Sequence, residues 1–228
     1  MKVKKIQIIP AVMPRNYDHL VEITKKFVDV VPYIQLDIMD GKNVPNRTWP
    51  HIPGDEHFSR IENEEEGMPE WESIDFEVDL MINDPEIWVP RWVFAGARRV
   101  IVHVEGMKDF ETIREAVPEG LIELGLAINI VTPLSALESY LDRIDFVQCM
   151  GIEKIGFQGQ PFDDRVVEHI QTLHTLRPEL PISVDGGVNF ENARSLVDAG
   201  ATRLVSGSAI LESDDVESAT RALENLVS

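Results

Sequence analysis

Two aspartates stand near the ends of apolar runs in widely separated parts of this 228-residue chain. Asp37 lies in Gln-Leu-Asp-Ile-Met-Asp-Gly at 35–41, and Asp185 closes Pro-Ile-Ser-Val-Asp at 181–185, directly before two glycines. Carboxylates that are held in place can remove a proton from one atom and deliver a proton to another. If both runs are strands that end at the same edge of a sheet, Asp37 and Asp185 form a proton-transfer pair.

Polar or sulfur-bearing side chains also end the neighbouring apolar runs. They are Asp79, His103, Asn129 and Met150. In an α/β barrel the active site lies at the C-terminal ends of the strands, which meet at one mouth. We therefore expect these four side chains to converge with the two aspartates.

Glycine-bearing loops follow the last three apolar runs. Glycine lets the backbone approach a ligand closely, so that N–H groups can point at an anion. Phosphate sites in α/β barrels are often built after strands 7 and 8, and the start of a short helix also favours an anion. Ordinary turn glycines are the alternative interpretation. We expect a bound phosphate group to contact Gly156, Gly159, Gly186, Gly187, Gly207 and Ser208.

Eight apolar segments alternate with segments of helical spacing, and this pattern predicts eight strands separated by helices. The strands are expected at 6–13, 33–39, 76–82, 99–104, 121–129, 144–150, 181–185 and 203–206. The helices are expected at 17–30, 84–95, 108–117, 132–140, 161–176 and 189–199, with short helices from Ser208 onward.

This alternation is typical of a parallel sheet that is covered by helices. Eight such units in 228 residues predict a single (β/α)8 TIM barrel over 1–228. An open doubly wound sheet is the alternative, but no Gly-x-Gly-x-x-Gly turn follows the first strand. The stretch at about 41–74 is irregular and acidic, and we interpret it as an insertion that is either a lid or a solvated excursion.

The composition excludes several classes of partner. With 21 Lys plus Arg against 40 Asp plus Glu, the formal net charge of −19 opposes binding to nucleic acid. No apolar run is long enough to span a membrane, and the basic start at 1–6 does not resemble a signal peptide. The single cysteine, Cys149, fits a reducing compartment. We expect a cytoplasmic protein without a nucleic-acid or membrane partner.

Short motifs occur along nearly the whole chain in a definite order. They are Ile-Pro-Ala-Val-Met at 9–13, Leu-Asp-Ile-Met-Asp-Gly at 36–41, Val-Pro-Asn at 44–46, Val-Asp-Leu-Met at 78–81, His103 with Glu105, Asn129 with Thr132-Pro133, Met150 through Gln160, Val-Asp-Gly-Gly-Val at 184–188 and Ser-Gly-Ser-Ala-Ile at 206–210. Together they resemble the ribulose-phosphate 3-epimerases, within the group of ribulose-phosphate-binding barrels.

The resemblance implies an isomerase, a racemase or epimerase acting on carbohydrates, whose partner is a phosphorylated small sugar. Asp37 and Asp185 match the family's acid/base residues, and the family is generally homo-oligomeric. The methionines at 39, 81 and 150 match those that wall the reacting carbon, although soft core filler is the alternative. We therefore expect substrate contacts from Met39, Met81, Met150 and His103.

The chain departs from the family pattern inside the expected active mouth. Gln35 and Asp79 stand where the family has its two metal-binding histidines, and Ala11 replaces a serine near the substrate. Lys154-Ile155 replaces one proline in the loop after strand 6, and Gln158 replaces a glycine. These changes favour altered metal or substrate use by a barrel whose scaffold motifs are kept.

Three carboxylates near one point cannot all stay ionised without compensation. One solution is a divalent cation, Mg²⁺ or Mn²⁺ in preference to Zn²⁺ or Fe²⁺, held by Gln35, Asp37, Asp79 and Asp185. The other is a site without metal, in which a carboxyl stays protonated or a cationic side chain neutralises the cluster.

Two kinds of function follow from these residues. The first is an epimerase or isomerase that acts on a ketose phosphate through Asp37 and Asp185. The second is a non-catalytic barrel that binds a sugar phosphate. Related decarboxylase and aldolase barrels carry an Asp-x-Lys-x-x-Asp pattern, which Asp-Ile-Met-Asp at 37–40 lacks.

Overall fold

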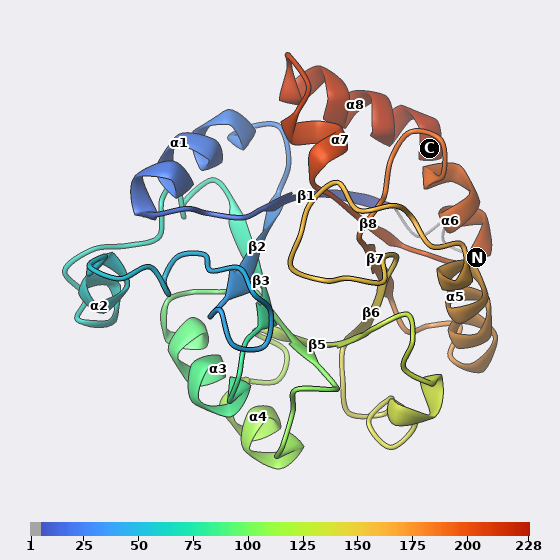
Figure 1. Cartoon of the computed structure of the whole chain (residues 1–228), viewed down its shortest axis with the longest axis horizontal. Helices are drawn as coiled ribbons and strands as arrows, with labels where there is room; N and C mark the ends of the chain where they lie inside the picture. The colour runs from blue at the N-terminus through green and yellow to red at the C-terminus, as the bar shows by residue number, and fades with distance from the viewer. Residues whose placement is uncertain (1–5) are drawn as a thin grey trace.

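The structure is a computed structural model that describes residues 6–228, and it confirms the predicted barrel. Eight parallel strands close into a ring in sequence order, with the helices outside (Figure 1). The strands are β1 Gln7–Val12, β2 Tyr33–Met39, β3 Asp75–Met81, β4 Arg99–His103, β5 Glu123–Ile128, β6 Phe146–Met150, β7 Ile182–Asp185 and β8 Arg203–Ser206. Residues 1–5, where we expected no signal peptide, lie outside the described part.

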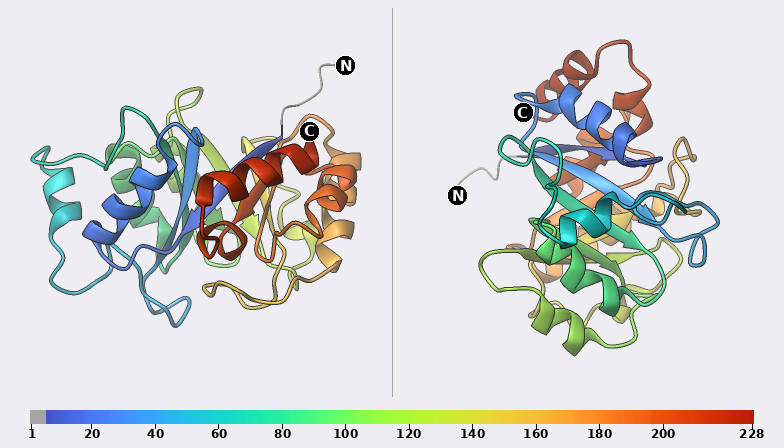
Figure 2. Two further views of the ribbon diagram at one scale, coloured as in Figure 1. Left: turned by 90° about the horizontal axis from the view of Figure 1, so that it is seen from above. Right: turned by 90° about the vertical axis from the view of Figure 1, so that its left-hand side faces the viewer.

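The helices form an outer layer around the strands (Figure 2). They are α1 Tyr17–Phe27, α2 His57–Glu62, α3 Pro85–Phe94, α4 Phe110–Ala116, α5 Arg165–Leu176, α6 Ala193–Ala199, α7 Ser208–Leu211 and α8 Val216–Val227, with the 3-10 turn η1 Leu134–Ala136. Among residues 6–228, none of these helices is long and apolar enough to cross a membrane.

The prediction of a helix over 132–140 was wrong. Only the 3-10 turn η1 forms there, and the following hydrogen bonds, such as Tyr140 N to Leu137 O, join residues three apart. This segment is therefore a series of tight turns instead of an α-helix. The end of the chain also differs from the expected short helices, because α8 runs for 12 residues after the Asp215 cap.

Alternation along the strands separates an apolar outer face from a partly polar lumen. In β2, Ile34, Leu36 and Ile38 belong to the core beneath the helices. Gln35 and Asp37 point the other way, since the Gln35 amide reaches Asp185 across the barrel. Polar residues at every second position of a strand thus meet inside the ring.

The lumen is layered along the barrel axis. At its N-terminal end, buried Arg99 pairs with buried Glu77 at 2.8 Å. Above this base lies an apolar layer that includes Ile101 and Phe146. Gly125 leaves room for the Phe146 ring, which would lie 2.4–2.8 Å from a Cβ at that position. The remaining polar layer, at the C-terminal mouth, contains the predicted aspartates.

The segment at 41–74 packs mainly on the outside of the barrel. Its Trp49 and Phe58 are buried and make edge or tilted contacts with Trp92 of α3. Figure 1 shows α2 between α1 and α3, away from the ring of strand ends. Only the first part of the segment reaches the mouth, where Val44 packs with Met39 and Met81.

Candidate functional site

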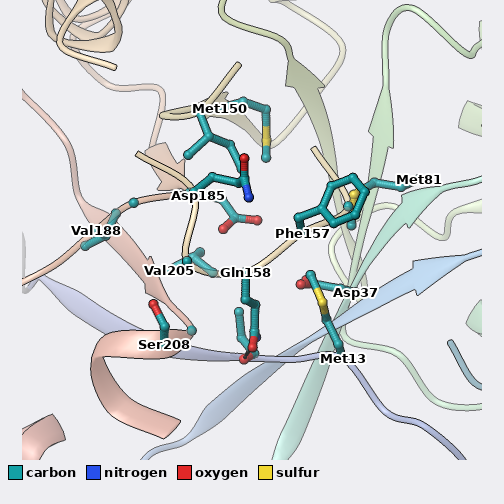
Figure 3. Close-up of a pocket in the computed structure, with 18 residues that line it drawn as sticks. Met13, Asp37, Met81, Met150, Phe157, Gln158, Asp185, Val188, Val205 and Ser208 are labelled. Carbon is teal, nitrogen blue, oxygen red and sulfur yellow. Dashed lines mark hydrogen bonds between the residues drawn. The ribbon is translucent and has the colours of Figure 1, made fainter. Parts of the chain in front are cut away.

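One cavity opens at the C-terminal end of the barrel, and Figure 3 shows its lining. Asp37 and Asp185 lie on its wall, with the sulfur-bearing side chains of Met13, Met81 and Met150 around them. All six residues predicted to bind phosphate also line this cavity: Gly156, Gly159, Gly186, Gly187, Gly207 and Ser208. The expected proton-transfer pair and the expected phosphate cradle therefore share one cavity.

Three carboxyl groups cluster below the mouth. Oxygens of Asp37, Asp79 and Asp185 all lie within 4.8 Å of one another. Their strands are positioned by the barrel closure, and Asp37 is directly in register with Asp79 on the adjacent strand. The three side chains are only 4%, 0% and 8% exposed, respectively. Solvent therefore does little to screen their mutual repulsion.

Two glutamine amides donate hydrogen bonds to this cluster. The Gln35 Nε2 lies 2.9 Å from Asp37 Oδ1 and 2.8 Å from Asp185 Oδ2, so it bridges the two predicted acid/base residues. The Gln148 Nε2 lies 3.3 Å from Asp79 Oδ2 and 3.4 Å from Asp185 Oδ2. Each carboxylate of the cluster thus faces at least one amide donor.

His103 lies behind the cluster instead of lining the cavity. Its ring is 2% exposed, and its Nε2 lies 3.1 Å from Asp79 Oδ1. Burial lowers the pKa of His103, but the carboxylate of Asp79 outweighs that effect and the net pKa is raised. The prediction of a substrate contact from His103 therefore has a different geometry from the one expected, since Asp79 is the partner that it touches.

The environment favours protons on the predicted acid/base pair. Burial and the nearby charges of Asp185 and Asp79 raise the pKa of Asp37 well above its usual range. Burial, followed by the charge of Asp79, raises the pKa of Asp185 to about 7. A carboxyl with a pKa near neutrality can serve as an acid or as a base at physiological pH.

The same cluster can hold a divalent cation. Its carboxylate oxygens are ligands that Mg²⁺ and Mn²⁺ prefer, and no imidazole contributes to the three-carboxylate set. The Oε1 atoms of Gln35 and Gln148 are buried without a hydrogen-bond partner, so two further oxygen acceptors are available beside it. This donor set fits a hard cation better than Zn²⁺.

Backbone conformation shapes the glycine-lined part of the cavity. Gly186 and Gly187 have φ angles of 99° and 71°, a left-handed region that side chains disfavour. A Cβ at Gly187 would lie 2.9 Å from the backbone of Phe162. The turn after β7 is therefore restricted to glycine by both conformation and space.

The loop at 151–160 closes over the mouth and is held at two points. On one side, Asn46 Nδ2 donates to Gly156 O at 2.7 Å. On the other side, Gln158 Nε2 donates to Ala11 O at 3.2 Å, across to β1. The predicted lid function at 41–74 is thus distributed differently: residue 46 anchors a second loop, and that second loop covers the site.

Other predicted residues take varied places. Met39 packs beneath Met81 and does not line the cavity, and neither does Asn129. Two contributors were missed: Met13, which follows β1 into the mouth, and Gln148. Gln148 had a sequence signal, because it lies two residues before Met150 and so shares its face of β6.

Comparison with known proteins identifies relatives of the whole barrel. The model of the ribulose-phosphate 3 epimerase family matches residues 7–211. A ribulose-phosphate 3-epimerase of Aquifex aeolicus is 34% identical over 87% of this chain and 85% of that protein. The corresponding Bacillus subtilis protein is 30% identical over 92% of this chain and 94% of that protein.

Solved structures share the fold at low sequence identity. KGPDC from Streptococcus mutans superimposes with a TM-score of 0.71, at 13% identity over 98% of both chains. A structure of the same protein in complex with D-ribose-5-phosphate gives a TM-score of 0.70 at 11% identity over 98% of both chains. The 3-hexulose-6-phosphate synthase of Salmonella typhimurium also gives 0.70, at 16% identity over 97% of this chain and 98% of that one.

Proposed function

Because the chain belongs to the ribulose-phosphate 3-epimerase family, we propose that it is an epimerase or isomerase that inverts a carbon of a ketose phosphate through Asp37 and Asp185. The observation that carries this proposal is the geometry of the pair. Both carboxyls line one cavity, both are buried, and one amide nitrogen bridges them at 2.9 and 2.8 Å.

Inversion at a carbon requires a proton to leave one face and another proton to arrive at the opposite face. Asp37 and Asp185 come from β2 and β7, which are not neighbours in the ring, so they approach the cavity from different directions. The raised pKa values of both carboxyls favour a state in which one is protonated and the other ionised. Such a state provides an acid and a base together.

The remaining cavity residues orient the substrate. The glycine-lined end, with Ser208, binds the phosphate group through backbone N–H groups. Met13, Met81 and Met150 exclude water from the reacting carbon, which strengthens electrostatic effects there. A divalent cation at Asp37, Asp79, Asp185 and Gln35 would supply Lewis-acid stabilisation of the negative charge that develops on substrate oxygen.

Transfer of solvent deuterium to D-ribulose 5-phosphate tests the reaction. Metal-free protein and protein with Mg²⁺, Mn²⁺, Zn²⁺ or Fe²⁺ are incubated in D₂O, and proton NMR follows the third carbon of the sugar. We expect exchange at that carbon, and a reduction of about 10²- to 10⁴-fold in Asp37→Asn and in Asp185→Asn. Asp109→Asn is the control, since Asp109 caps the distant helix α4.

A protein that binds the sugar phosphate without any exchange would be a non-catalytic binding protein. In that case Asp37→Asn would leave the affinity for D-ribulose 5-phosphate unchanged, and there would be no exchange to lose. Exchange on a different ketose phosphate, with none on D-ribulose 5-phosphate, would keep the acid/base pair and change the substrate.

A further inference from the structure

Gln148 shares the mouth layer of the lumen with the three aspartates. It lies on β6, in register with Ala127 of β5 and Ser183 of β7, and its side chain is fully buried. Its Nε2 reaches both Asp79 and Asp185, at 3.3 and 3.4 Å. These distances are longer than ordinary N–H···O bonds, so the amide is held only loosely against the carboxylates.

The other half of this amide has no partner. Gln148 Oε1 is buried and accepts no hydrogen bond, and the same is true of Gln35 Oε1. Buried acceptors in native proteins are nearly always satisfied, and an exception often marks the place of a water or an ion. Two such exceptions at one cluster of carboxylates indicate that both amides have a second arrangement.

Rotation of a terminal amide by half a turn exchanges its nitrogen and its oxygen within nearly the same volume. With the oxygens toward the cluster, the amides would repel Asp37, Asp79 and Asp185. A cation among the carboxylates reverses this preference, because it attracts every oxygen present and repels the N–H groups.

We propose that Gln148 is a ligand of a divalent cation in this chain, adding its amide oxygen to those of Gln35 and the carboxylates of Asp37, Asp79 and Asp185. Without the cation, the same amide holds Asp79 and Asp185 through its nitrogen. The inference rests on the proposed function only in that it concerns the same site. Five side chains with oxygen donors suit Mg²⁺ or Mn²⁺, and His103 orients Asp79 from outside the set.

Binding of Mn²⁺ to the full-length, metal-free protein tests this assignment without any sugar. Electron paramagnetic resonance measures the free Mn²⁺ in a titration of the unaltered protein, Gln148→Leu and Ser183→Ala. Leucine keeps the bulk of the side chain and removes the oxygen. Ser183 is buried beside Gln148 in the lumen and makes no hydrogen bond to the aspartates, so its alanine variant is the matched control.

We expect Gln148→Leu to weaken Mn²⁺ binding at least tenfold, whereas Ser183→Ala binds as the unaltered protein does. Near-ultraviolet circular dichroism verifies that each variant is folded. A third variant, Gln148→His, places an imidazole at the same position. It should bind Co²⁺ with a changed visible absorption spectrum and should raise the preference for Zn²⁺ over Mn²⁺.

Unchanged Mn²⁺ affinity in folded Gln148→Leu overturns the assignment, and so does an unaltered protein that binds no Mn²⁺ at millimolar concentration. Neither result depends on turnover. If Gln148 governs Mn²⁺ binding while no sugar phosphate exchanges deuterium, the proposed function fails and the cation ligand stands. If deuterium exchange occurs while Mn²⁺ binding ignores Gln148, the reverse holds.

Discussion

The barrel encloses two charged layers that are built on opposite principles. At the base, each charge has a partner of opposite sign: Arg99 contacts Glu77 at 2.8 Å, and Arg203 contacts Glu123 at 2.6 Å. At the mouth, the side chains of Asp37, Asp79 and Asp185 carry the same sign within 4.8 Å. Both layers are made by inward-pointing residues of the same strands, since Glu77 and Asp79 are two positions apart on β3.

This contrast separates structural charge from functional charge. The base arginines also stack on aromatic rings, Arg99 over Tyr33 at 3.8 Å and Arg203 over Phe146 at 4.5 Å, so their positions are fixed from several sides. The mouth keeps its repulsion and leaves amide oxygens unpaired. Unrelieved repulsion stores a preference for protons or a cation, which is the property that proton transfer needs.

The base should show the largest effect on stability. Arg99→Met would leave Glu77, which is fully buried, without its principal partner. Loss of one member of a buried ion pair typically costs about 3–5 kcal/mol. We expect the free energy of unfolding in urea at pH 7 to fall by about that amount, with no loss of a group that lines the cavity.

The adjacent residue provides a matched control for this variant. Arg98 pairs with Asp75 at 3.3 Å, but its side chain is 57% exposed. Arg98→Met should therefore cost less than about 1 kcal/mol. If Arg99→Met were as stable as Arg98→Met, the base would not be the structural layer that this comparison requires.

The mouth should make the metal-free protein less stable as pH rises. The folded pKa of Asp185 is raised to about 7, so its carboxyl stays protonated while the unfolded chain has already lost that proton. This contribution to stability is complete below the unfolded pKa, near 4, and is lost as pH rises to about 7. We expect a loss of about 1.4 kcal/mol per pH unit between pH 5 and 7 in EDTA, measured by urea unfolding.

Two comparisons isolate the mouth in this experiment. Asp185→Asn cannot ionise, so its stability should depend less steeply on pH over the same range. Saturating Mg²⁺ or Mn²⁺ should also flatten the dependence, because a cation binds the ionised carboxylates of the folded state alone. Equal slopes in the unaltered protein and in Asp185→Asn would show that repulsion at the mouth has been relieved in another way.

The sequence was sufficient to predict the barrel, since apolar runs and glycine turns locate its strands closely. The run at 33–39 was predicted with the same bounds as β2. Its inward face was less visible: Gln35 and Asp37 alternate with apolar residues, but one strand does not reveal which residues it meets across a ring. The contacts of Gln35 with Asp185 and of Arg99 with Glu77 depend on closure of the barrel.

Local patterns also misled where tertiary contacts decide. Thr132-Pro133 followed by apolar spacing predicted a helix to residue 140, but the chain makes only η1 and further turns before β6. The composition at 41–74 is acidic and irregular, yet Trp49 and Phe58 bury themselves beside α3. Aromatic residues scattered through a polar stretch were the available signal for packing against the barrel.

The smallest expected effect concerns the loop that covers the mouth. Gln158→Ala removes the hydrogen bond from Gln158 Nε2 to Ala11 O, which joins the loop at 151–160 to β1. One hydrogen bond of this kind contributes about 1 kcal/mol. Local opening should therefore become about fivefold more frequent, and amide hydrogen exchange in the loop should accelerate by the same factor.

Gln160→Ala is the control, because Gln160 lies in the same loop, also lines the cavity and makes no side-chain hydrogen bond among those described for residues 6–228. Its exchange rates should match those of the unaltered protein. The base is informative here as well: amides of β4 beside Arg99 should keep their protection in both variants, since the two layers are separated by Ile101 and Phe146. Faster exchange at β4 in Gln158→Ala would show that closing the mouth and holding the base are one cooperative event, and the division into a functional and a structural layer would then fail.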